Sequence, residues 1–362
     1  MNMFMVELQN RLTDIGIDAA LFNTSEITRS VNLRRLSGFS GSDASLLVTQ
    51  DEAHLFTDGR YQTQSHYECQ DIRIHVTRNK ISSLARLVNR LGLRTVGLEG
   101  TRISFEFISA LARKTGSTSM ISFKRNLLDE LRIRKSPDEI RTIRTAAELA
   151  SNACMEIIGR GLLGRSEARV ASDLESLFRE RGAIGASFPT IVASGPRSAL
   201  PHGTATSKII QRGDLVIIDY GCNWLDYCSD ETLTCIVDSS PTSEQKRMYD
   251  AVRQAHDNAI SAVMPGLKAR DIDKVARDTI HRAGFGQNFL HSLGHGVGLE
   301  VHEAPYLSPK SSATLTPGMV FTIEPGVYVE GVGGVRLESL VHLTDSGPEI
   351  LNSASKELIH AY

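Results

Sequence analysis

Cysteine and long hydrophobic runs are scarce in this sequence. Its 362 residues include five cysteines, none in a C-x-x-C pair, and an odd number spread along the chain does not suggest a disulfide framework. No apolar run reaches about 18 residues, the length of a membrane-spanning helix. The first residues include Glu7 and Asp14 and lack the apolar core of a signal peptide. These absences predict a cytoplasmic protein that does not bind membranes.

An excess of charge of either sign is also absent. The 40 basic and 42 acidic residues leave a formal net charge of -2, so no broad field attracts nucleic acid or anionic lipid. We therefore expect no nucleic-acid partner. A G-x-S-x-G motif is missing as well, which removes support for a serine nucleophile at a strand-to-helix turn.

Two domains are predicted, with a boundary near residue 132. The length exceeds the roughly 100 to 200 residues of a typical domain. In the first part, helical patterns alternate with short apolar runs such as ASLLVT and AHLFTD, which predicts an α/β domain over residues 1–131. Ser136, Pro137 and Glu139 then give the N-cap, first-turn proline and capping box of a helix. We expect the second domain to span residues 132–362.

The second part is predicted to be an α+β domain. Amphipathic helical patterns such as SEARVASDLESLFRERG are separated by strand-like runs, among them DLVIIDYG, DETLTCIVD and GMVFTIEPGVYV. The helices are expected to be segregated from a mainly antiparallel sheet.

Four acidic residues lie in these strand-like runs, where a half-buried strand favours apolar side chains. They are Asp219, Asp230, Glu324 and Glu338. Any one strand acid is more often an edge or salt-bridge residue, but four buried carboxylates together call for multivalent cations. Asp219 ends one run and Asp230 opens the next, so a hairpin between them would bring both carboxylates together.

A glycine-rich stretch, SLGHGVGLEVHE, carries His295 and His302 seven residues apart. Its glycines disfavour a helix, and an odd spacing sends side chains to opposite faces of a strand. We therefore expect an irregular backbone that presents both imidazoles. Carboxylates together with one imidazole suit Mn²⁺, Co²⁺, Fe²⁺ or Zn²⁺, and four carboxylates are enough for two ions that share bridging ligands.

These residues, in this order, resemble the creatinase and methionine aminopeptidase superfamily, metallopeptidase family M24. The pattern is Asp219, eleven residues to Asp230, GHGVG with His295, VHE with His302, EPG with Glu324 and RLE with Glu338. FSGSDASLLVT, LFTDGRY and the LPHG around His202 look most like the Xaa-Pro aminopeptidase and prolidase branch. The resemblance implies a pita-bread fold with a curved sheet for the second domain, a bridged two-metal site and a homodimer.

The resemblance also implies roles for single residues. The implied metal ligands are Asp219, Asp230, His295, Glu324 and Glu338. Glu324 is the implied base, with His302 and His202 acting on the oxyanion or the leaving nitrogen. The implied substrate contacts are His202, His291, His302 and Arg336, although His291 has a packed loop residue as its alternative.

Two positions depart from the family pattern. Leu233 stands where the family usually has arginine, and Ser339 replaces a common acid after Glu338. Neither change removes a ligand, but both put in question the surroundings that orient the ligands.

We predict a metal-dependent Xaa-Pro aminopeptidase with two divalent ions, Mn²⁺ first and Co²⁺, Zn²⁺ or Fe²⁺ as alternatives. Its substrate would be a peptide with proline at the second position. An Xaa-Pro dipeptidase (prolidase) is the alternative, and a non-catalytic peptide-binding module is a more remote one. The additional N-terminal domain disfavours a methionine aminopeptidase, and the complete ligand set disfavours a metal-free creatinase.

Overall fold

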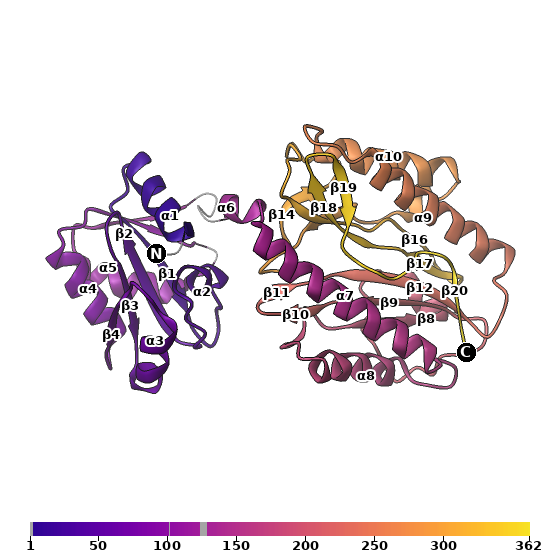
Figure 1. Ribbon diagram of the computed structural model, residues 1–362, viewed down its shortest axis with the longest axis horizontal. Coiled ribbons are helices and arrows are strands. Elements are labelled where there is room, and N and C mark those ends of the chain that lie inside the picture. Colours follow the sequence, from indigo (N-terminus) through magenta and orange to yellow (C-terminus); the bar gives the residue numbers. More distant parts are fainter. Residues whose placement is uncertain (1–2, 101, 124–128) are drawn as a thin grey trace. The chain divides into compact units, whose positions relative to one another are not determined.

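The computed structural model describes residues 3–100, 102–123 and 129–362. The chain divides into two compact units, Met1–Leu131 and Arg132–Tyr362 (Figure 1). None of the helices in the described ranges is long and apolar enough to cross a membrane.

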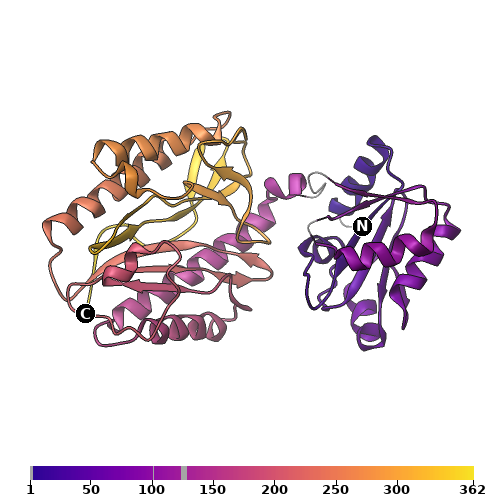
Figure 2. The same ribbon diagram turned by 180° about the vertical axis from the view of Figure 1, so that it is seen from behind.

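The N-terminal unit is a six-stranded sheet with helices on both faces (Figures 1 and 2). The strand order is β4(Arg73–Val76), β3(Ala53–Thr57), β2(Ala44–Thr49), β1(Ala19–Thr24), β5(Thr95–Leu98) and β6(Ser119–Ser122). Only β2 runs antiparallel to its neighbours within this sheet. Phe22 packs with helices α1(Met3–Asp14) and α2(Val31–Ser37), whereas Leu21 packs with α4(Lys80–Arg90) and α5(Phe105–Thr115). The alternation of side chains along β1 therefore separates the two cores.

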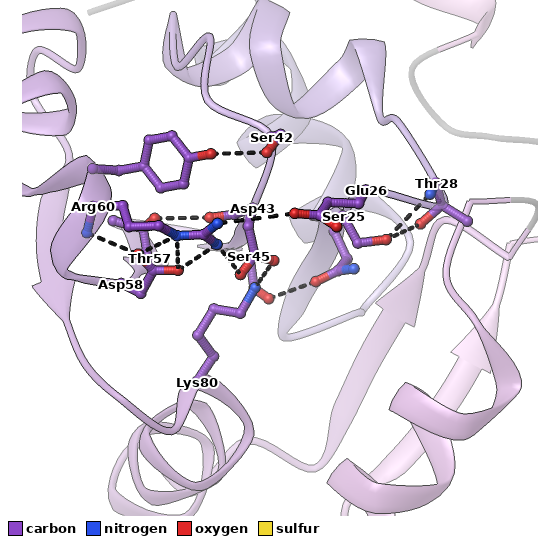
Figure 3. Close-up of polar contacts among 12 residues, drawn as sticks. Ser25, Glu26, Thr28, Ser42, Asp43, Ser45, Thr57, Asp58, Arg60 and Lys80 are labelled. Atoms are coloured by element: carbon purple, nitrogen blue, oxygen red, sulfur yellow. Dashed lines mark hydrogen bonds and ion pairs between the residues drawn. The ribbon is translucent and has the colours of Figure 1, made fainter.

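Polar contacts join the strand ends at one edge of this unit (Figure 3). Asp58, which follows β3, accepts a hydrogen bond from the Arg60 backbone N–H at 2.8 Å and so caps the short helix η1(Gly59–Tyr61). The Arg60 guanidinium also donates to both oxygens of Asp58, at 2.9 and 3.1 Å. Asp43, directly before β2, pairs with Lys80 at the start of α4. The motifs FSGSDASLLVT and LFTDGRY therefore supply the ionic contacts of one sheet edge.

Helix α6(Asp129–Ile133) spans the boundary between the units, and the C-terminal unit continues with helices α7(Pro137–Gly159) and α8(Glu167–Glu180). The predicted capping box of α7 is confirmed: Ser136 and Glu139 each bond the backbone N–H of the other. Helices α7 and α8 pack on the sheet β20(Ile359–Ala361), β12(Glu231–Val237), β9(Leu215–Tyr220) and β8(Ile191–Ser194). The core between them includes Ile218 and Leu233.

A second helix pair, α9(Ser243–Ala262) and α10(Ala269–Arg282), covers the other half of the unit. It packs on the sheet β14(Glu303–Leu307), β13(Gly294–Gly296), β15(Val320–Ile323), β18(Ser339–Thr344) and β19(Gly347–Ile350), and on the hairpin β16(Gly326–Val329), β17(Gly333–Arg336). The last sheet is β11(Tyr227–Cys228), β10(Cys222–Trp224) and β7(Gly185–Ala186). Within the described ranges, every strand pair of this unit is antiparallel except β12 with β20. The predicted class, a mainly antiparallel sheet with segregated helices, is confirmed.

Candidate metal centre

The four carboxylates and His295 converge from both halves of the C-terminal unit. Asp219 lies in β9 and Asp230 directly precedes β12, on the side covered by α7 and α8. His295 lies in β13, Glu324 directly follows β15 and Glu338 separates β17 from β18, on the side of α9 and α10. The expected hairpin between the two aspartates is present, because β9 and β12 pair directly and antiparallel, with Asp219 opposite Thr232. Its connection is longer than a turn and contains the short strands β10 and β11.

The five side chains fit divalent cations. One ligand atom each of Asp230, His295 and Glu338 lies within 4.8 Å of the others. His295 Nε2 is 3.2 Å from Glu324 Oε1 and 3.7 Å from Asp230 Oδ2. Asp219 Oδ1 is buried and accepts no hydrogen bond from the residues that the structure describes. A buried carboxylate oxygen without a donor is unfavourable unless a cation binds it, so the donor set fits a metal.

Hydrogen bonds fix the orientation of the His295 ring. Its Nδ1 atom is 3.2 Å from the carbonyl oxygen of Gly296, and its backbone N–H donates to Thr322 Oγ1 at 3.1 Å. With Nδ1 bonded to this carbonyl oxygen, Nε2 is the ring nitrogen that faces the carboxylates. This is the usual support of a metal-ligating imidazole.

The crowding of buried carboxylates changes their pKa values in the metal-free chain. Burial, followed by the charges of Glu338 and Asp219, raises the pKa of Asp230 well above its ordinary value. Burial, followed by the charges of Glu324 and Asp219, does the same to the pKa of Glu338. Burial opposes ionisation of Glu324 too, but the hydrogen bond and charge of His295 lower its pKa overall. Cations would relieve the mutual repulsion of these groups.

Arg336 organises the surroundings of this cluster. Arg336 is 3% exposed, and its guanidinium donates to Asp219 Oδ2 at 2.6 Å, Thr232 Oγ1 at 3.1 Å and Tyr328 Oη at 2.8 Å. A fourth bond goes to the carbonyl oxygen of Pro201 at 3.0 Å. Most of its N–H groups are therefore directed at the protein rather than at a substrate.

His291 is tied to the same network. The Tyr328 hydroxyl lies 2.9 Å from His291 Nε2, and His291 Nδ1 lies 2.8 Å from the carbonyl oxygen of Ser292. Burial lowers the pKa of His291, so the ring is neutral at neutral pH, with Nδ1 as donor and Nε2 as acceptor. No periodic pattern in the sequence singles out Tyr328 as a site residue. Thr232, which donates to Glu338 Oε2 at 2.7 Å, shares the site-facing side of β12 by simple alternation.

The structure places neither departure from the family pattern among the carboxylates. Leu233 is 1% exposed and lies in the core formed with α7 and α8, on the opposite face of β12 from Thr232. The hydroxyl of Ser339 lies 3.0 Å from His256 Nε2, on helix α9. The position at which the family commonly has an acid therefore carries a neutral hydroxyl here, next to the buried imidazole of His256.

A cavity of about 470 Å³ contains the whole cluster. All nine expected site residues line it: His202, Asp219, Asp230, His291, His295, His302, Glu324, Arg336 and Glu338. The expected irregular backbone is only partly correct, since His295 lies in a strand and His302 directly precedes β14. A bulge between His295 and Gly296 shifts the register, and the rings of the two histidines lie edge to face with centroids 4.3 Å apart.

The comparisons with known proteins agree with this site. Residues 141–345 match metallopeptidase family M24, and residues 6–134 match the creatinase/prolidase N-terminal domain. The chain belongs to metallopeptidase family M24. Among its M24 relatives, the Xaa-Pro dipeptidase of Pyrococcus horikoshii is 38% identical over 348 residues, 95% of each chain.

Solved M24 structures are similar over nearly the whole chain. The Xaa-Pro dipeptidase from Bacillus anthracis has a TM-score of 0.94 and 36% identity, covering 99% of this chain and 100% of that one. The X-Pro aminopeptidase from Thermotoga maritima has a TM-score of 0.90 and 36% identity, covering 98% and 100%. The prolidase branch of M24, the pita-bread fold and the assignment as a metallopeptidase, all predicted from the sequence, are confirmed.

Proposed function

We propose that this enzyme hydrolyses Xaa-Pro dipeptides with the help of two divalent metal ions. The observation that carries the proposal is the cluster of four carboxylates and one imidazole inside a single cavity. The choice of dipeptides is supported by two relatives described as Xaa-Pro dipeptidases, each 38% identical to this chain. It reverses the order of the two activities expected from the sequence.

The Xaa-Pro aminopeptidase activity is the second candidate. It is favoured by the likeness to the Thermotoga maritima X-Pro aminopeptidase and by the surroundings of Arg336. A dipeptidase must recognise the free carboxylate of proline, for which a fixed cation is the strongest partner. Arg336 is the sole lysine or arginine among the residues that line the cavity, all of them in the described ranges, and it is largely engaged by protein acceptors.

The chemistry is metal-assisted amide hydrolysis. The residues that would hold the ions are Asp219, Asp230, His295, Glu324 and Glu338. When bound, two divalent ions lower the pKa of a water molecule and polarise the scissile carbonyl. Glu324, ionised in the metal-free chain, would accept the proton of that water.

The remaining steps fall to the histidines. His302 and His202 line the cavity beside the carboxylates and would stabilise the oxyanion or protonate the leaving nitrogen. The nitrogen of proline has no hydrogen within the peptide bond, so it must receive a proton as it departs. The donor set favours Mn²⁺, with Co²⁺, Zn²⁺ and Fe²⁺ as alternatives.

The test compares kcat/KM for Ala-Pro and Ala-Pro-Ala with Mn²⁺-loaded protein. We expect the dipeptide to be favoured by about tenfold or more, which is about 1.4 kcal/mol of transition-state binding. Equal or faster cleavage of the tripeptide would favour the aminopeptidase. Protein stripped by a chelator is the control, and full activity in that sample would contradict the metal assignment.

A homodimer and a cytoplasmic location remain our proposals, the first by resemblance and the second from the composition. Light scattering coupled to size exclusion would test the dimer.

A further inference from the structure

A buried ionic cluster lies directly behind the loop that carries His302. Glu303 Oε1 accepts a hydrogen bond from Lys135 Nζ at 2.7 Å, and Glu303 Oε2 pairs with the guanidinium of Arg132. The same Arg132 Nη2 atom lies 2.9 Å from Glu300 Oε2. Arg132, Lys135 and Glu303 are 3%, 6% and 8% exposed. The positively charged side chains of Arg132 and Lys135 therefore bind the acidic residues on both sides of His302, Glu300 and Glu303.

The segment that carries the cations is itself held in place. The backbone N–H of Lys135 donates to the carbonyl oxygen of Gly318 at 2.7 Å, and Arg134 forms a β-bridge with Met319, just before β15. Ser136 then caps α7. The side chains of Arg132 and Lys135 therefore extend from a backbone segment that is fixed by hydrogen bonds to the rest of the unit.

The His302 ring, in contrast, makes no hydrogen bond within the ranges that the structure describes. Its ring contact is the edge-to-face arrangement with His295. The loop itself packs closely against the ionic cluster, because a Cβ atom at Gly298 would lie 2.5 Å from Glu303 Oε1. The placement of His302 must then come from its backbone, which the bonds of Glu300 and Glu303 anchor on either side.

We propose that Arg132 and Lys135 are positioning residues. Through Glu300 and Glu303 they hold His302 in the position from which it acts on the substrate. The inference rests on the proposed function, in which His302 acts on the substrate. The cations lie behind the loop and are absent from the residues that line the cavity, so they act through His302 and not on the peptide. Loss of Lys135 removes the cationic partner of Glu303 Oε1 and leaves Arg132 on Oε2, so the buried carboxylate is only half compensated, which moves the loop.

The test is a double-mutant cycle between Lys135→Met and His302→Ala in the Mn²⁺-loaded enzyme. Lys135→Met should lower kcat about 10- to 100-fold, the effect of a displacement of about 1 Å, with metal content and KM close to wild type. In the His302→Ala background the same change should cause no further loss of kcat. Equal losses in both backgrounds, or loss of metal from Lys135→Met, would overturn the proposal.

Three controls complete the design. Lys208→Met removes a lysine that also pairs with a carboxylate at 2.7 Å, that of Asp214, away from the cavity; it should leave kcat unchanged and show no coupling to His302. If Lys135→Met does not fold, Glu303→Asp keeps the charge and shortens the side chain by one methylene, and the same non-additivity is expected. Hydrogen exchange of residues 297–303 should rise in Lys135→Met relative to Lys208→Met, and unchanged exchange would contradict the proposal without reference to activity.

Wild-type protein that cleaves no Xaa-Pro peptide would reject the proposed function, whereas additive losses in a cleaving enzyme reject only the role of Arg132 and Lys135.

Discussion

His295 and His302 lie on one hairpin, with ring centroids 4.3 Å apart, yet the protein supports them differently. His295 is fixed through Gly296 and Thr322, as expected for a metal ligand. Burial lowers the pKa of His302, and the nearby His295 lowers it further, so this ring is neutral near pH 7. A neutral imidazole beside the carboxylates, with no hydrogen bond to its ring in the described ranges, suits proton transfer rather than ion binding.

Single substitutions should separate the two roles. We expect His295→Ala to weaken metal binding at least about 10- to 100-fold, because a ligand is lost. His302→Ala should keep its metal and lose about 10²- to 10⁴-fold in kcat. Metal content by plasma mass spectrometry and kcat on Ala-Pro test both statements. Equal metal loss in the two variants would refute this separation.

Strand β12 shows how alternation divides one element between two tasks. Thr232 and Thr234 face the site and bond Glu338 and the backbone of Arg336, whereas Leu233 faces the core. The period of two was readable from the sequence, and so were the strand ends at which the acids lie. Which face meets the ligands was not readable, because it depends on which helix pair covers the strand.

Substitutions at neighbouring positions of β12 should therefore affect different properties, one the stability of the fold and the other the affinity for metal. Leu233→Ala should cost about 2–5 kcal/mol of unfolding free energy through the cavity it leaves, with metal affinity unchanged. Thr232→Val keeps the shape but removes a partner of Glu338 and Arg336, so metal affinity should fall about 10- to 100-fold. Denaturant unfolding and metal titration of both variants provide the measurement. A loss of metal affinity in Leu233→Ala would contradict the division of faces.

Elements whose conformation depends on residues far away in the sequence could not be predicted. The glycine-rich stretch around His295 becomes strand β13 only because β14 and β15 flank it, and its bulge sets the ring positions. The hairpin of β10 and β11 is inserted between two strands that still pair. The capping box at Ser136 was predictable because all its partners are local.

At the scale of the whole molecule, the proposed metal ligands come from both helix-covered halves of the C-terminal unit. Bound cations would therefore join the two halves, and the metal-free protein keeps its carboxylates crowded. Because burial and neighbouring charges raise the pKa values of Asp230 and Glu338, the folded metal-free state binds more protons than the unfolded state. This contribution to stability is present below the ordinary carboxyl pKa of about 4 and is lost as pH rises through the raised values.

A pH series of melting temperatures tests this linkage. As pH rises above the ordinary carboxyl pKa of about 4, the Tm of metal-free protein should fall relative to that of the Asp230→Asn/Glu338→Gln variant, which lacks both titrating groups. The increase in Tm caused by Mn²⁺ should grow over the same range, because the carboxylates must lose protons to bind the ion. A stabilisation by Mn²⁺ that shrinks as pH rises would contradict this account.

The spread of the ligands along the chain also has a consequence for biosynthesis. Asp219 and Glu338 are 119 residues apart, and a ribosome adds about 5–20 residues per second. A growing chain therefore lacks Glu338, the last of the proposed ligands, for roughly 6 to 24 s after Asp219 has been added. Products of interrupted translation that end before Glu338 would be inert as peptidases, even with a finished N-terminal unit. Hydrolytic activity thus arises only after Glu338 has been added.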